Sequence, residues 1–163
     1  MTAGTADGGA NKATTGTPSG AERRPASLAA VIAYLADGEG ALAVAELRAL
    51  STDAAPVLSP AEMRYWLGLA HLLAYDWSGA AHEFHRYVSG QDGGWRAGWA
   101  QLHMGRAFEQ AGRTDEASLA YRGVLATEGA ERAARKMAFD RMSRIANSLS
   151  IGYGQAPVRE AQR

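Results

Sequence analysis

Apolar side chains recur every three to four residues along most of this chain, which is the pattern of amphipathic helices. Gly, Pro, Asp and Ser residues interrupt the pattern at short intervals and mark the helix ends. The clearest start is at Ser59, where Pro60 suits the first helical position and Glu62 can complete a capping box. The pattern predicts helices over residues 28–36, 41–50, 60–74, 77–88, 95–111, 114–126 and 130–149.

The helical pattern also repeats at a fixed interval. Ala43, Ala80 and Ala117 follow one another in steps of 37 residues (80 − 43 = 37 and 117 − 80 = 37). A shared period of this length indicates stacked copies of one helix pair rather than one irregular core. Two further sets share the step: Ala33, Ala70 and Ala107, and the larger residues Leu47, Phe84 and Tyr121.

At these positions the helix pairs resemble the tetratricopeptide repeat (TPR) family. The third pair, over about residues 97–127, matches most fully, through Met104-Gly105, Ala107-Phe108, Gly112, Asp115-Glu116-Ala117, Tyr121 and Val124. The second pair, over 60–88, matches through Leu67-Gly68, Ala70, Ala80, Phe84 and Tyr87. The first pair, over 26–50, matches through Ala33-Tyr34, Gly38, Ala43, Leu47 and Leu50.

The resemblance implies an all-α fold, a right-handed superhelical stack of helix-turn-helix repeats that forms a TPR-like α-solenoid. The three units would span about residues 26–58, 60–94 and 97–128, with a C-terminal capping helix at 130–149. The family repeats every ~34 residues, and we assign the extra residues of this chain to the loops 51–59 and 89–94. Tyr75 stands where Gly38 and Gly112 lie in the other units, so that turn is expected to differ.

Two glycines lie inside predicted helices, although glycine costs about 1 kcal/mol there relative to alanine. They are Gly68 and Gly105. Two antiparallel helices approach closely only where side chains are small, so we expect the partner helix to lie near Ala80 and Ala117. Phe84 and Tyr121 are then expected to fill the space between successive units.

In the family, the first helix of each unit lines a concave groove. By this register the predicted ligand-groove residues are Tyr65, Leu69, Leu72, Leu73, Trp99, Leu102, Arg106 and Glu109. Such a groove is mostly apolar and suits an amphipathic helix or an extended apolar peptide. Tyr65 and Trp99 are the expected anchors, because aromatic side chains dominate many interfaces. An acidic C-terminal tail is not the expected ligand, since Arg106 is the only cation in this set.

The resemblance thus implies a noncatalytic protein–protein interaction module: an adaptor, a scaffold or a co-chaperone-like protein whose partner is unidentified. The alternative is a self-association module, a homo-oligomer in which another copy fills the groove. No phosphate loop or dinucleotide motif is present, so no enzyme activity and no cofactor are predicted. The pair His82 and His85 around Glu83 is one residue too close for the zinc-protease motif, and neither His71 nor His103 obviously completes a site.

Composition and charge bear on the kind of partner and on the cellular compartment. Seventeen basic and seventeen acidic residues cancel, which disfavours broad nucleic-acid binding. The basic segment 131–144 could contact an acidic partner or RNA, but Glu131 and Asp140 partly offset its charge. The favoured interpretation is that its arginines form the solvent-exposed face of a capping helix. The absence of cysteine is compatible with a reducing cytoplasm. No apolar run reaches the ~20 residues of a membrane span.

The two ends of the chain are expected to lie outside the fold. Residues 1–25 have almost no large apolar side chain and are predicted to be a disordered leader. Residues 151–163 are predicted to be a flexible tail. The alternative for Arg23-Arg24 followed by residues 28–36 is a secretion signal, with a cleavage site at Ala43-Val44-Ala45. Asp37 and Glu39 interrupt that apolar segment, which favours the repeat instead.

Overall fold

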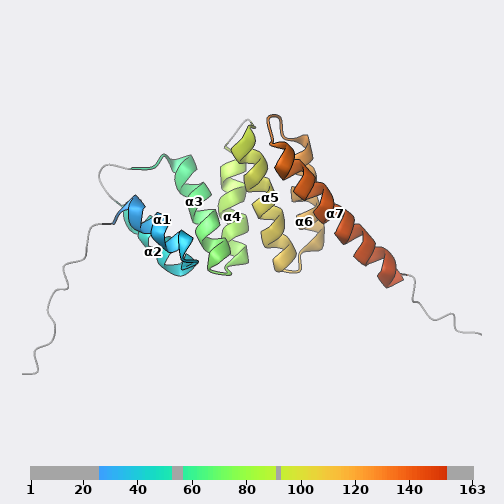
Figure 1. Cartoon of the computed structure of the whole chain (residues 1–163), viewed down its shortest axis with the longest axis horizontal. Helices are drawn as coiled ribbons and strands as arrows, with labels where there is room; N and C mark the ends of the chain where they lie inside the picture. Colours follow the sequence, from blue (N-terminus) through green and yellow to red (C-terminus); the bar gives the residue numbers. More distant parts are fainter. Residues whose placement is uncertain (1–25, 53–56, 91–92, 154–163) are drawn as a thin grey trace, which may run out of the picture.

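A computed structural model describes residues 26–52, 57–90 and 93–153, with side-chain surroundings up to residue 148. Within these ranges the chain forms helices and no strand (Figure 1), which confirms the predicted all-α class. The predicted leader 1–25 lies outside the described residues. The described helices are α1 (Leu28–Ala36), α2 (Gly40–Leu50), α3 (Pro60–Leu73), α4 (Trp77–Val88), α5 (Trp95–Gln110), α6 (Thr114–Ala126) and α7 (Arg132–Tyr153).

The helix ends follow local chemistry. The predicted capping box is confirmed at α3: Glu62 N–H donates to Ser59 Oγ at 3.2 Å, and Ser59 N–H donates to Glu62 Oε2 at 3.0 Å. Asp76 caps α4 by accepting from the Gly79 N–H at 2.9 Å. The last helix departs from prediction, since α7 continues to Tyr153 and thus includes the first three residues of the predicted tail.

The helices form two layers. Each helix contacts the next one in the chain, and α1 contacts α3, α3 contacts α5, and α5 contacts α7. The odd-numbered helices therefore lie together in one layer and α2, α4 and α6 in the other. Figure 1 shows the units following one another along the long axis, with α7 slanting across the end of the stack.

The helix glycines lie under aromatic rings. A Cβ added at Gly68 would lie 2.7 Å from Phe84 Cε1, and one added at Gly105 would collide with the Tyr121 ring. Phe84 and Tyr121 are themselves fully buried. The close contact is thus made by the aromatic side chain sixteen residues further on (84 − 68 = 16; 121 − 105 = 16). The expected close approach near Ala80 and Ala117 did not identify this partner, although both alanines are fully buried.

In the first unit, the interface between α1 and α2 has other residues at the glycine and aromatic positions. Val31 stands at the glycine position (68 − 37 = 31), and Leu47 stands at the aromatic position; both are fully buried, as is Ala43. A larger residue on α1 is thus matched by a smaller one on α2. Val31 and Leu47 belong to one buried cluster, so the interface of the first unit is also filled.

One position of the repeat has a different environment at the first unit. Ala70 and Ala107 are fully buried, whereas Ala33 is exposed. Ala70 packs in a cluster with Leu47 of the preceding unit, and Ala107 packs in a cluster with Phe84 of the preceding unit. In the part of the chain that the structure describes, no helix precedes α1, so Ala33 has no such neighbour.

We predict that the cost of filling the glycine position depends on the ring above it. Gly105→Ala should lower the free energy of unfolding by about 1–3 kcal/mol, because the methyl group overpacks against Tyr121. In a Tyr121→Leu background the same substitution should cost much less, as in the first unit. Urea unfolding of the four proteins measures the coupling. Equal costs in both backgrounds would show that the ring does not require the glycine.

Candidate functional site

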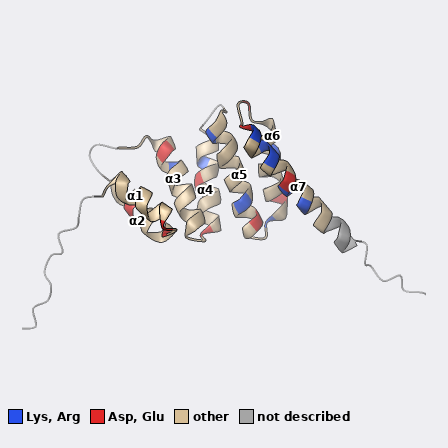
Figure 2. Ribbon diagram, viewed as in Figure 1, with Lys and Arg blue, Asp and Glu red and all other residues tan. Residues whose placement is uncertain are grey.

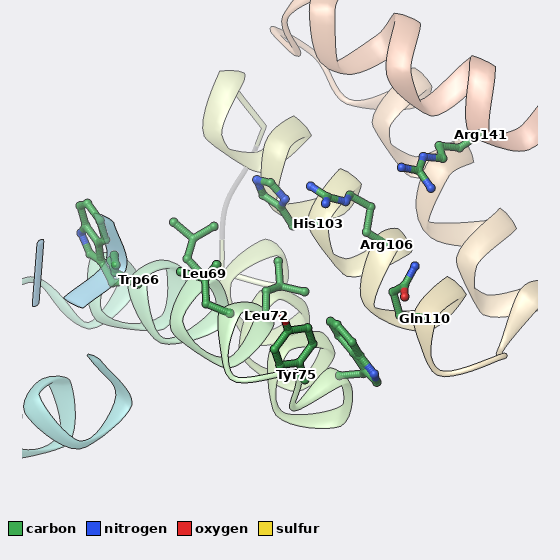
Figure 3. Close-up of a pocket in the computed structure, with 11 residues that line it drawn as sticks. Trp66, Leu69, Leu72, Tyr75, His103, Arg106, Gln110 and Arg141 are labelled. Atoms are coloured by element: carbon green, nitrogen blue, oxygen red, sulfur yellow. The ribbon is translucent and has the colours of Figure 1, made fainter. Parts of the chain in front are cut away.

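A pocket of about 600 Å³ opens between α3 and α5, and α7 adds one residue to its edge. Leucine and aromatic side chains cover the α3 side, and polar side chains cover the α5 and α7 side (Figure 3). The pocket thus lies on the layer of odd-numbered helices, where the resemblance placed the groove. Its lining residues are Leu35, Trp66, Leu69, Leu72, Leu73, Tyr75, Trp77, His103, Arg106, Gln110 and Arg141.

The lining follows the 37-residue repeat. Three positions on α3 and their equivalents on α5 all line the pocket, because they occupy the same helix face in successive units. The apolar member of each pair is on α3 and the polar member is on α5. The pairs are Trp66 with His103, Leu69 with Arg106, and Leu73 with Gln110.

Four predicted groove residues line this pocket: Leu69, Leu72, Leu73 and Arg106. Leu73 is 38% exposed and Leu69 and Leu72 are partly buried, so all three present apolar surface. The arrangement of Leu69, Leu72 and Arg106 across the pocket is visible in Figure 3. Half of the eight predicted groove residues therefore line one pocket, and their role in binding stays a prediction.

The other four predicted groove residues lie outside the pocket. Leu102 is a correction: it is fully buried in a cluster with Tyr121 and therefore presents no surface to a ligand. Glu109 lies seven residues from Leu102 on the same helix face and contacts Tyr121 as well. Tyr65 packs on the rings of Phe84 and Tyr87, at centroid distances of 5.9 and 5.3 Å.

Trp99 is the fourth of these residues, and it belongs to the junction with α7. Its indole N–H donates to Glu131 Oε2 at 3.1 Å. The expected aromatic anchors, Tyr65 and Trp99, thus do not line the pocket. The aromatic residues that do line it, Trp66, Tyr75 and Trp77, were missed because the family register points to other helix positions and stops at the helix end.

Tyr75 forms the turn between α3 and α4 in a left-handed conformation. Its φ is 58°, close to the 75° of Gly38 and the 74° of Gly112. The Asp76 N–H donates to the His71 carbonyl, just as the Arg113 N–H donates to the Phe108 carbonyl. The expectation of a different turn at Tyr75 is therefore wrong. The backbone keeps the turn of the other units, although a side chain replaces glycine.

The strain at Tyr75 is local to the pocket rim. Left-handed backbone is unfavourable for a residue with a Cβ by about 1–2 kcal/mol. The Tyr75 side chain is 77% exposed and has one ring neighbour, Trp77, at a centroid distance of 5.5 Å. Both rings line the pocket. A strained residue that gains little burial is a reason to look for a role in binding.

A polar network attaches α7 beside the pocket. Arg141 Nη1 donates to Glu109 Oε1 at 3.1 Å, and the Tyr121 hydroxyl donates to Glu109 Oε2 at 2.6 Å. Burial, together with the hydrogen bond to Glu109, raises the pKa of the Tyr121 phenol. Because Glu109 accepts from both groups, it holds the Arg141 side chain at the pocket edge.

Arg106 is the uncompensated charge of the site. Its side chain is exposed and forms no hydrogen bond or ion pair with any residue that the structure describes. Arg141 adds a second positive charge, which Glu109 partly offsets. Figure 2 shows that basic side chains gather on α7, whereas α1 has no charged residue.

His103 lies between two rings on the polar wall. Its ring is 5.5 Å from that of Phe84 and 6.0 Å from that of Trp99, in stacked orientations. Its buried Nδ1 has no hydrogen-bond partner among the described residues. Burial, together with the positive charge of Arg106, lowers the pKa of His103 from 6.5 to about 4. The imidazole is therefore neutral at pH 7.

The histidines considered for a metal lie elsewhere. His82 and His85 are exposed on α4, and neither lines this pocket. Across residues 26–52, 57–90 and 93–153, no three His, Cys, Asp or Glu side chains are placed to hold a metal ion together. In the same ranges, no helix combines the length and the apolar character needed to cross a membrane.

We predict that glycine at position 75 stabilises the fold. Tyr75→Gly should be more stable than Tyr75→Ala by about 1 kcal/mol, because only glycine adopts this backbone without penalty. Both variants lack the ring, so the comparison separates backbone strain from the contact with Trp77. Thermal or urea unfolding measures the difference. If the alanine variant is as stable as the glycine variant, the turn is not strained.

We predict an acid-sensitive contribution from His103. Below pH 6.5 the unfolded chain binds a proton that the folded chain excludes until about pH 4. Stability should therefore fall as the pH is lowered through this window, by at most about 3 kcal/mol from this group. His103→Phe keeps a ring between Phe84 and Trp99 but cannot titrate, so its unfolding free energy should fall less. Parallel pH profiles for the two proteins would contradict the assignment.

Comparison with known proteins supports the fold and leaves the family open. No protein-family model and no curated protein matches the chain. Among solved structures, a crystal structure of a TPR-like protein from Chlorobium tepidum TLS matches with a TM-score of 0.51 and 19% sequence identity. The match covers 73% of this chain and 91% of that one. The likeness shows a TPR-like helical repeat fold.

Proposed function

We infer that this chain is a noncatalytic protein-interaction module that binds a segment of a partner protein in the pocket between α3 and α5. The observation that carries the proposal is the apolar wall of Leu69, Leu72 and Leu73, which is open to solvent opposite Arg106. A contiguous apolar surface in a concave pocket is typical of a binding site, whereas single exposed apolar residues scattered over a surface are not. The TPR-like fold of the structural neighbour is in keeping with this class.

The bound segment is a helix or an extended peptide that places large apolar side chains on this wall. Helix-in-groove binding uses apolar anchors on one face of the ligand. Tyr75 and Trp77 at the rim supply aromatic surface for the same anchors. This assignment replaces Tyr65 and Trp99 as the anchoring residues and involves no covalent chemistry.

The proposal is tested with two exposed leucines. A random peptide library displayed on phage is selected against the full chain, and the affinity of the enriched peptides is measured by fluorescence anisotropy. Leu73→Glu should weaken binding by about 2 kcal/mol or more, because it puts a charge against the apolar anchor. Leu119→Glu changes a leucine that is 63% exposed on α6, outside the pocket, and should bind as the unaltered chain does.

Two outcomes would contradict the proposal. If no peptide is enriched, or if Leu119→Glu abolishes binding while Leu73→Glu does not, the pocket is not the binding surface. The self-association alternative makes a separate prediction. Light scattering would then show a concentration-dependent dimer that Leu73→Glu dissociates.

A further inference from the structure

The charges around the pocket point to a particular chemistry of the partner. Among the described residues, no Asp or Glu side chain lines the pocket, whereas Arg106 and Arg141 do. The two arginines come from α5 and α7, so α7 completes the polar wall. Among the predicted groove residues Arg106 is the only cation, which disfavours an acidic C-terminal tail as the ligand. The second arginine removes this objection.

The donor groups of both arginines are available. Arg106 has no hydrogen bond or ion pair within the described part of the chain. Arg141 uses only Nη1 toward Glu109, at 3.1 Å to Oε1 and 3.3 Å to Oε2. Its Nη2 and Nε donors have no partner among the described residues. A guanidinium is suited to a carboxylate, because its planar donors match the two oxygens.

Glu109 reduces the net positive charge on the polar wall of the pocket. It pairs with Arg141 and also accepts from Tyr121 at 2.6 Å, so it is held back from the pocket. Arg106, Arg141 and Glu109 together carry one net positive charge. His103 beside them is neutral at pH 7 and adds no charge. The site therefore favours a partner group with negative charge.

We propose that the bound partner segment is acidic as well as apolar, with an Asp or Glu side chain held between Arg106 and Arg141. Large apolar side chains of the same segment lie on the Leu69, Leu72 and Leu73 wall. This inference rests on the proposed function and adds the partner's charge to it. It also makes α7 part of the binding site rather than only the end of the stack.

Residues 1–25 and 154–163 do not match that description. Residues 1–25 contain Asp7 and Glu22 but no large apolar side chain except Met1. Residues 154–163 contain Glu160 between two arginines and one medium-sized apolar residue, Val158. Neither of these two segments supplies an apolar face beside a carboxylate. We assign the site to a segment of a partner protein.

The test compares charges on both sides of the interface. Peptides enriched on the full chain are sequenced, and one is synthesised with its acidic residues and again with Asn or Gln in their place. The enriched set should carry Asp or Glu next to large apolar residues. Loss of the carboxylate, or Arg106→Gln, should weaken binding about fivefold to tenfold, and raising the salt concentration should weaken it for the acidic peptide only.

Two comparisons distinguish a direct contact between Arg106 and the peptide carboxylate from an effect of overall charge and from a folding defect. Arg122→Gln removes an exposed cation on α6, outside the pocket, and should leave affinity unchanged. Arg106→Gln should lose its effect when the peptide already lacks its carboxylate, a non-additivity that a folding defect does not produce. Arg141→Gln should reduce the preference for the acidic peptide in the same way.

Each other outcome overturns a defined part of the account. If enriched peptides are apolar without acidic residues, or if Arg106→Gln and Arg122→Gln act alike, the partner is not acidic, although the pocket still binds. If Leu73→Glu has no effect on any enriched peptide, the proposed function itself fails. If the chain dimerises and Arg106→Gln dissociates the dimer, the occupant is a second copy.

Discussion

The packing of an aromatic ring on a helix glycine sets how closely the two helices of the second and third units approach each other. Phe84 lies on Gly68 and Tyr121 lies on Gly105, with no room for a side chain at either glycine. This contact joins α4 to α3 and α6 to α5. Direct contacts of α1 with α3, α3 with α5 and α5 with α7 join the first helices into one layer. The pocket is the part of that layer where the side chains of α3 and α5 do not fill the space between them.

The repeat divides the chemistry of the pocket between its two walls. Equivalent positions are apolar on α3 and polar on α5, as in Leu69 and Arg106. A fold built from copies can thus present different side chains on one surface without changing its backbone. Tyr75 also changes a side chain without changing the backbone. It keeps the left-handed turn that Gly38 and Gly112 adopt and adds an aromatic ring at the pocket rim. Its ring extends the apolar wall beyond the end of α3.

Much of the fold could be predicted from the sequence, because helix periodicity, the Ser59 capping box and the repeat are all local or regular signals. The pocket could be predicted only in part. Leu102 was assigned to the groove, yet it lies on the helix face of Gly105, which packs on Tyr121. Applying the 37-residue step to Trp66 and Leu73 identifies His103 and Gln110. Arg141 has no such signal, because α7 does not continue the motif, and its position depends on the long-range contact with Glu109.

The central claim is that partner segments bind between α3 and α5. An NMR titration of the full chain with an enriched acidic peptide tests it most directly, since amide shifts report contact at each residue. The account predicts that the largest changes fall on residues 66–75 and 103–110, with a smaller group around Arg141. Changes concentrated on residues 115–123 of α6 would place the ligand on the other layer and contradict the account.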